Sequence, residues 1–190
     1  MKRWTLVAVC GSMVLGFGAT AFAQQDTPAP VVRGRRASPP QPQQQQGADY
    51  FAGTWSFSYI GREHPLTHGP RTGVAVFTKQ PNGTAVSMTN EGKTDAGAAY
   101  KETATYTWNA STKTMAIAEP LVGAQLKGNG NWSSPLSIHF EADPITANGQ
   151  TLKIRRTYNI FSAQSFEIVE ELSTNGGPYQ RLGNATFTKK

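Results

Sequence analysis

Hydrophobic and polar residues alternate along much of residues 51–190, and no segment there keeps a period of 3.6 residues. Alternation with a period of two is typical of a β-strand with one buried face. The run 51–60 shows it first, because Trp55, Phe57 and Tyr59 fall on one face and Ser and Thr residues on the other. We predict that this run is the first strand of a folded domain.

Similar runs follow, separated by turn signals such as Pro81-Asn82-Gly83. Further strands are predicted at 71–79, 84–91, 99–108, 115–118, 136–140, 151–161, 165–172 and 179–188. The stretch 121–127 is poorly patterned, and loops are expected at 61–70 and 128–131. About ten strands with short links favour pairing between sequence neighbours. The pattern therefore predicts an all-β fold, a single antiparallel up-and-down β-barrel of about ten strands, whose closure removes exposed edges.

The same alternation predicts that charged and hydroxyl-bearing residues point into the barrel. They are Glu102, Arg156, Tyr158, Glu170, Tyr179 and Arg181. An isolated buried charge costs several kcal/mol, so these groups must be paired, hydrated or in contact with a polar ligand. A barrel of about ten strands is also wide enough that its own side chains need not fill it.

Two interpretations of this interior remain open. In the first, pairs of Glu and Arg brace the barrel and nothing else enters. In the second, Arg156 and Arg181, with Tyr158 and Tyr179, receive the carboxylate or other polar head of an amphipathic molecule. The planar guanidinium suits that task because it matches a carboxylate in two hydrogen bonds. Trp55, Tyr106 and Trp108 would then line the apolar part of the pocket.

The N-terminal segments differ in composition from the predicted barrel. Residues 1–23 combine a basic start, a short apolar run and the cleavage pattern Ala21-Phe22-Ala23, as a signal peptide does. Residues 24–48 are rich in Pro and Gln and predict a disordered linker. The β-barrel domain is expected over 49–190. We therefore expect a secreted or periplasmic protein, of bacterial type, that does not span a membrane. Cys10, the sole cysteine, would leave with the signal.

Charge argues against nucleic acid as a partner. The whole chain has a net charge of +6, but residues 49–190 hold 13 Lys and Arg against 11 Asp and Glu. Such a balanced domain lacks the basic face that binds phosphate backbones. The linker carries Arg33, Arg35 and Arg36, which could contact an acidic surface of the cell envelope, although a solvated linker explains them as well.

No motif of a known catalytic class is present. The sequence has no nucleophile elbow, zinc-protease helix, phosphate-binding loop or dinucleotide fingerprint. His64 and His68 lie close together in a loop that does not fix their geometry, so we expect neither a metal site nor a cofactor. Glu102 or Glu170 acting as a base is the enzyme hypothesis that remains, and the composition favours a protein without catalytic activity.

Some of these residues are similar to those of the calycin superfamily, which includes lipocalins, fatty-acid-binding proteins and nitrobindin-like barrels. Phe51-Ala52-Gly53-Thr54-Trp55 resembles the F-x-G-x-W start of their first strand, and Arg181 lies where those folds place an Arg over that Trp. The stretch 173–181 resembles the closing hairpin of secreted bacterial lipocalin-like proteins, with Asn175 in place of Asp. The resemblance implies a barrel with an internal pocket. Haem binding, known in nitrobindin-like members, would need an inward-facing His, which these patterns do not supply.

The function that these observations favour is non-catalytic binding of a small amphipathic or lipophilic ligand inside a β-barrel. The alternative is an envelope interaction or structural protein, in which the barrel is solid and the basic, Pro-rich arm of residues 24–48 makes the contacts. The two hypotheses differ in whether the barrel holds an accessible pocket.

Overall fold

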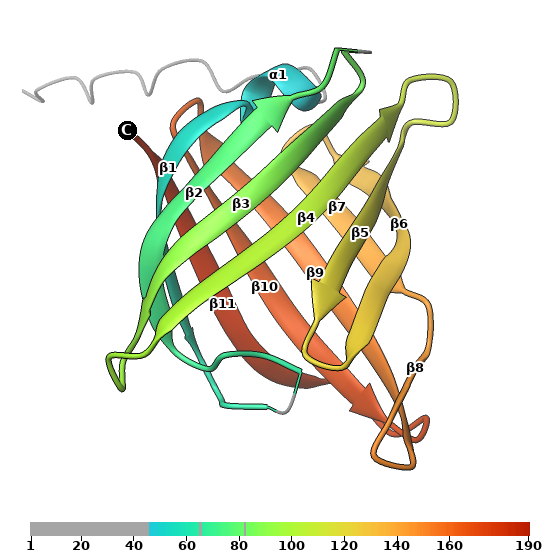
Figure 1. Cartoon of the computed structure of the whole chain (residues 1–190). Coiled ribbons are helices and arrows are strands. Elements are labelled where there is room, and N and C mark those ends of the chain that lie inside the picture. Colours follow the sequence, from blue (N-terminus) through green and yellow to red (C-terminus); the bar gives the residue numbers. More distant parts are fainter. Residues whose placement is uncertain (1–45, 65, 82) are drawn as a thin grey trace, which may run out of the picture. The chain divides into compact units, whose positions relative to one another are not determined.

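The computed structural model of the chain describes residues 46–64, 66–81 and 83–190. Within these ranges one short helix precedes eleven strands (Figure 1). The elements are α1 (Ala48–Phe51), β1 (Gly53–Gly61), β2 (Arg71–Lys79), β3 (Ala85–Thr94), β4 (Ala99–Asn109), β5 (Thr114–Leu121), β6 (Ala124–Ser134), β7 (Ser137–Ala142), β8 (Ile145–Ala147), β9 (Gln150–Ser162), β10 (Ser165–Thr174) and β11 (Gln180–Lys189). The expected signal peptide and nearly all of the expected linker lie outside the described residues and stay predictions.

Antiparallel pairing between neighbours closes the sheet on itself. Each strand from β1 to β7 pairs with the next, β7 pairs with β9, and β9, β10 and β11 follow in order. β11 returns to β1, where Phe187 lies opposite Phe57. The short strand β8 extends β9 beyond β7 and stands outside the closed ring of ten. The predicted single antiparallel up-and-down barrel of about ten strands is therefore confirmed.

Strict alternation of side chains fills the barrel. Along β9, Leu152, Ile154, Arg156, Tyr158 and Ile160 are buried, and the residues between them are partly exposed. The same pattern runs through β10 and most of β4, as the sequence predicted. Successive residues of a strand point to opposite faces of the sheet, so each strand contributes one row of side chains to a common interior.

Three local features differ from the prediction. Residues 128–131 belong to β6 rather than to a loop, because Gly128 pairs with Ala142 and Gly130 with Phe140 of β7, so closely that a Cβ on Gly128 would clash with the Glu141 backbone oxygen. Phe51 lies in α1, and the first strand begins at Gly53. β8 was not foreseen at all, since three residues are too few to show a period.

The two ends of the barrel are covered by different segments. At one end, here the α1 end, Phe51 is only 1% exposed and packs against Phe166 and Trp108, with ring centroids 5.2 and 5.3 Å apart. At the other end, the segment between β1 and β2 turns inward and buries Leu66 (Figure 1). Among the described residues, no helix has the length and apolarity that crossing a membrane requires.

Candidate functional site

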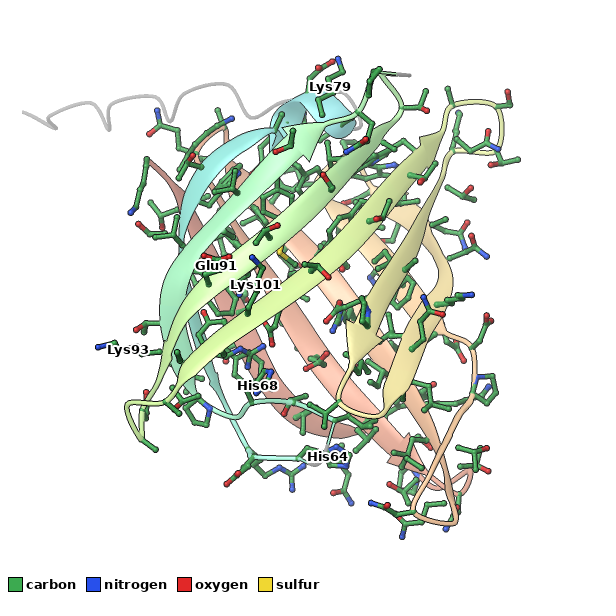
Figure 2. The ribbon with its side chains drawn as sticks, in the orientation of Figure 1. His64, His68, Lys79, Glu91, Lys93 and Lys101 are labelled. Atoms are coloured by element: carbon green, nitrogen blue, oxygen red, sulfur yellow. The ribbon has the colours of Figure 1, made fainter. Side chains whose placement is uncertain are left out.

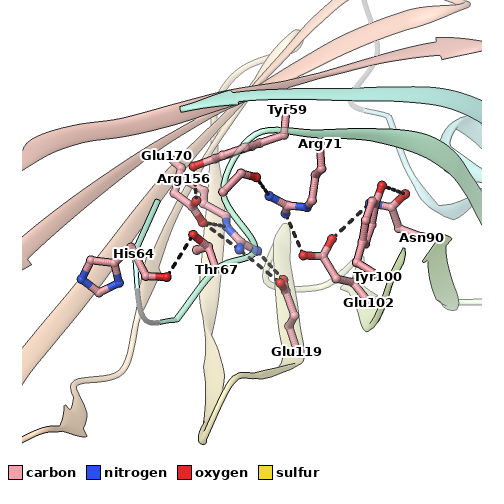
Figure 3. Close-up of polar contacts among 11 residues, drawn as sticks. Tyr59, His64, Thr67, Arg71, Asn90, Tyr100, Glu102, Glu119, Arg156 and Glu170 are labelled. Atoms are coloured by element: carbon pink, nitrogen blue, oxygen red, sulfur yellow. Dashed lines mark hydrogen bonds and ion pairs between the residues drawn. The ribbon is translucent and has the colours of Figure 1, made fainter. Parts of the chain in front are cut away.

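Arg156 is the centre of a charged cluster inside the barrel, and β9 directs its side chain inward between Ile154 and Tyr158 (Figure 3). Its Nη1 donates to Glu119 Oε2 at 2.5 Å, and its Nε donates to Glu170 Oε1 at 2.8 Å. Glu119 comes from β5 and Glu170 from β10, directly opposite Arg156 in the sheet. Both carboxylates are buried, so the pairs lie in a low dielectric and hold three strands together.

A second arginine lies beside the first. Arg71, the first residue of β2, is paired with Glu102 of β4 at 2.7 Å and donates to the backbone oxygen of Gly69 at 2.7 Å. Its guanidinium also lies 4.5 Å from the ring centre of Tyr59, a distance typical of a cation–π contact. Glu102 in turn accepts a hydrogen bond from Asn90 Nδ2 at 3.1 Å. Charges from β2, β4, β5, β9 and β10 therefore meet in one region.

The cluster contains more acid than base. Glu102, Glu119 and Glu170 face only two guanidinium groups, so full ionisation leaves one negative charge in excess. Burial raises the pKa of Glu102, with the nearby Arg71 lowering it and Glu119 raising it further. Burial likewise raises the pKa of Tyr100 to about 12, so this phenol stays protonated and donates to Asn90 Oδ1 at 3.2 Å.

A small cavity of about 40 Å³ adjoins the cluster. The lining residues are Phe57, Tyr59, Arg71, Met88, Asn90, Glu102, Tyr106, Glu119, Arg156, Ile168, Glu170, Ala185 and Phe187. This volume holds about three water molecules, since one needs about 10–15 Å³. This cavity thus has room for water but not for a lipid chain.

A larger pocket opens where the barrel wall is incomplete. β4 and β5 pair only between Thr105–Asn109 and Thr114–Ala118, so residues 99–104 of β4 have no neighbour on that side, and the two strands separate (Figure 1). Between them lies a pocket of about 220 Å³, here called the mouth. Its lining residues are Leu66, His68, Lys101, Glu102, Glu119, Pro120, Leu121 and Val122. Glu102 and Glu119 line both the mouth and the interior cavity.

The rim of the mouth carries charge of its own. Lys101 of β4 points away from the interior and pairs with Glu91 of β3 at 2.5 Å (Figure 2). Both side chains are more than half exposed. His68, from the segment that buries Leu66, lies 6.0 Å from the ring of Tyr100. The mouth therefore combines an apolar wall, an acidic floor and one cation that already has a partner.

Most of the sequence-predicted site residues do point inward. Arg156, Tyr158 and Glu170 are buried, and the Glu102 side chain is 14% exposed. Trp55 and Tyr106 are buried and Trp108 is partly buried, but all three lie toward the α1 end, packed against Phe51 or its neighbours. Trp55 and Trp108 thus lie apart from the charged residues, whereas Tyr106 also lines the cavity beside them. The cavity beside the charged cluster is not lined by Trp55 or Trp108.

The inward placement predicted for Tyr179 and Arg181 is wrong. A bulge in β11 leaves Leu182 without an opposite residue on β10. Gly183 therefore lies opposite Glu170, and Arg181 lies opposite the next residue, Glu171. Residues opposite one another share a face, and Glu171 belongs to the outer face, so Arg181 lies outside and exposed.

Tyr179 also lies on the outer surface, 4.2 Å from the guanidinium of Arg155. The position over Trp55 that the calycin resemblance gave to Arg181 belongs to Lys189, whose Nζ is 5.1 Å from that ring. Neither Tyr179 nor Arg181 contributes to the charged cluster.

Sequence reasoning missed Arg71, Glu119 and Asn90. Two of them continue the inward-facing row of their strand. Arg71 precedes Gly73, Ala75 and Phe77 on β2. Glu119 follows Met115 and Ile117 on β5. Pro120 hid the second signal, because a proline suggests the end of a strand. No group of three or more His, Cys, Asp or Glu side chains in the described ranges is arranged to hold a metal ion.

Comparison with known proteins identifies the fold but no family. No family model and no curated protein matches the sequence. Among solved structures, the chain is similar to Rv2717c from M. tuberculosis, with a TM-score of 0.58 and 14% identity over 77% of this chain and 99% of that one. It is also similar to the S-type phycobiliprotein lyase CPES from Guillardia theta, with a TM-score of 0.52 and 9% identity over 75% of this chain and 90% of that one. The chain therefore shares the fold of these structures.

Proposed function

We propose that the protein binds a small amphipathic molecule at the mouth between β4 and β5. The observation that carries the proposal is that Glu102 and Glu119 line both the mouth and the interior cavity. A ligand can therefore reach the charged cluster without crossing the packed core. Pockets that bind small molecules commonly combine apolar walls with a few convergent polar groups.

The apolar part of the ligand lies against Leu66, Leu121 and Val122. Leu66 is 3% exposed and forms the inner wall, whereas Val122 is 52% exposed at the rim. Covering Val122 removes apolar surface from water, which contributes roughly 25 cal/mol per Å². The polar end faces the carboxylates, so the residues that carry the site are those of the mouth together with Arg71 and Arg156 behind them.

This site differs from the one that the sequence suggested. The guanidinium of Arg156 donates to Glu119 and Glu170 and so is not free to grip a ligand carboxylate. The proposal keeps the class of ligand, keeps Glu102 and Arg156 in or behind the site, and moves the apolar contacts from the α1 end to the mouth.

The proposal includes export through the segment 1–23, with a periplasmic or extracellular place of action. Removal of that segment in the mature protein, seen by intact mass of protein purified from its own host, tests this part. The same spectrum under native conditions shows whether a small molecule stays bound.

A packed barrel without a guest is the second candidate function, and the small interior cavity favours it. In that case the protein is an interaction or structural protein of the envelope, and residues 24–48 make the contacts with envelope material. Deleting the arm then removes binding to envelope material, and no small molecule raises the melting temperature of the barrel.

Methyl NMR of the full chain tests binding at the mouth directly. A panel of small amines, acids and alcohols with short alkyl chains is titrated, and we expect shifts in the methyl signals of Leu66, Leu121 and Val122. Val76, exposed on the outer face of β2, serves as the control and keeps its signal position. Shifts confined to other methyl groups, or none with any compound, contradict the proposal.

A further inference from the structure

The charges at the mouth also indicate which kind of polar head the site takes. We propose that the ligand bears a protonated amine, which the carboxylates of Glu102 and Glu119 bind, and not the carboxylate head that two inward arginines suggest. This inference rests on the proposed binding function and specifies its ligand class.

The arginines do not present free positive charge to the mouth. Arg156 donates through Nη1 and Nη2 to Glu119 and through Nε to Glu170. Arg71 donates through Nη2 to Glu102 and through Nη1 to the Gly69 backbone. The Nη donors of both arginines are thus engaged, so a ligand carboxylate would have to compete with Glu119 and Glu102 for them, and Arg71 Nε is left as a donor without a partner among the described residues.

The carboxylates, in contrast, are in excess. With three of them and two guanidinium groups, the buried cluster lacks one positive charge. The two that line the mouth, Glu102 and Glu119, are those that a bound group can reach, whereas Glu170 lines only the interior cavity. Bringing an ammonium group to this position supplies the missing charge, and an ion pair that is partly shielded from water is stronger than an exposed one.

A second, independent observation points to a hydrogen-bond acceptor, such as a water molecule, in the interior cavity behind the mouth. Arg71 Nε has no hydrogen-bond partner among the described residues, and the side chain, which lines the cavity, is only 9% exposed. A buried donor left without a partner costs about 1–3 kcal/mol. The cavity has room for about three waters, and one there can accept a hydrogen bond from Nε and another from the ligand ammonium.

Lys101 is the cation that could repel such a ligand. Its Nζ pairs with Glu91 on the outer face, 2.5 Å away, and both groups are well exposed, so solvent and Glu91 screen its charge. The Glu102 and Glu119 carboxylates face inward from the same opening. The net field at the floor of the mouth is therefore set by the carboxylates.

Three probes of the same alkyl chain test the inference: hexylamine, hexanol and hexanoate, each titrated into the full chain at pH 7.5 and followed by the methyl signals of Leu121 and Val122. Hexylamine is protonated at this pH, as a lysine side chain is. We expect it to bind, hexanol to bind about tenfold more weakly, and hexanoate not to bind measurably.

Paired substitutions at Val122 are compared with each other, because both remove the same half-exposed apolar contact and differ in charge, and the Leu121 methyl signals report binding to both. Val122→Glu should bind hexylamine about tenfold more tightly than Val122→Lys. Equal or tighter binding of hexanol or hexanoate at the mouth overturns the amine preference and leaves the binding function standing. No methyl shift with any of the three probes overturns both.

Discussion

At the scale of single residues, Arg155 and Arg156 are neighbours in the sequence whose environments are opposite. Arg156 points inward and pairs with Glu119 and Glu170, and its side chain is 10% exposed. Arg155 points outward and pairs with Glu171 at 2.9 Å, with 39% of its side chain exposed. Replacing each arginine in turn therefore compares the loss of a buried ion pair with the loss of a surface ion pair.

We expect Arg156→Met to lower the free energy of unfolding by about 3–5 kcal/mol, because two buried carboxylates lose their counter-charge. Arg155→Met should cost less than about 1 kcal/mol, since exposed pairs contribute little. Urea unfolding followed by tryptophan fluorescence measures both. Equal losses would show that the cluster is not buried as the structure has it.

At the scale of elements, the segment between β1 and β2 depends on one imidazole. His64 Nδ1 accepts a hydrogen bond from the Leu66 backbone N–H at 3.3 Å, and the His64 backbone oxygen accepts one from Thr67 N at 2.8 Å. Burial lowers the pKa of His64, with Glu170 opposing the shift and Arg62 adding to it. Protonation of Nδ1 would remove the acceptor that holds Leu66 in the wall of the mouth.

A lowered pKa in the folded state has a definite sign for stability. As the pH falls from about 6.5 through the folded-state pKa, the unfolded chain binds more protons than the folded one, so the free energy of unfolding decreases. His64→Asn removes this contribution. We expect the advantage of the parent chain over this variant, measured by urea unfolding, to be smaller at pH 5.5 than at pH 8. A difference that stays constant across this range would contradict the assignment.

The elements also show how far the sequence could predict the site. Alternation on the long strands β4, β9 and β10 correctly placed Glu102, Arg156 and Glu170, because a strand with one buried face repeats every two residues. It failed for Arg181, because the bulge at Leu182 reverses the inward and outward faces for the residues of β11 that precede it. A bulge depends on how two strands pair, and that information is not local to either.

The mouth itself could not be predicted from the patterns of individual strands. It exists because β4 and β5 pair along only part of their length. Glu102 and Glu119 both line the pocket that opens where this pairing stops. Pro120, which has no N–H to donate, lies on β5 beside that interruption. The sequence shows the proline but not which partner strand it leaves unpaired.

At the scale of the whole molecule, the interior is divided between two kinds of packing. Toward the α1 end the chain fills the space with its own aromatic rings, such as Phe166 stacked on Phe187 at 4.4 Å. Toward the mouth it leaves a charged region with a small cavity and a pocket that opens to the outside. This division explains why Trp55 and Trp108 do not line the proposed ligand site although Trp55 is fully buried, whereas Tyr106 borders the interior cavity behind the mouth.

Phe51 is the residue that completes the aromatic half, because α1 brings its ring into contact with Phe77, Tyr106, Trp108 and Phe166. We expect Phe51→Ala to lower the free energy of unfolding by about 3–5 kcal/mol and to leave an apolar cavity. Such cavities stay dry and accept small apolar molecules. Benzene should therefore raise the melting temperature of the variant and leave that of the parent chain unchanged, as measured by circular dichroism.

Phe161→Ala is the matched control, since this phenylalanine of β9 is 54% exposed and its loss should change stability by less than about 0.5 kcal/mol. If benzene stabilises the parent chain as well, the α1 end already holds free space, and the ligand site would then extend to Trp55 and Trp108. If it stabilises only Phe51→Ala, the ring of Phe51 is what keeps an apolar guest out of the α1 end, and the mouth remains the proposed route for small molecules.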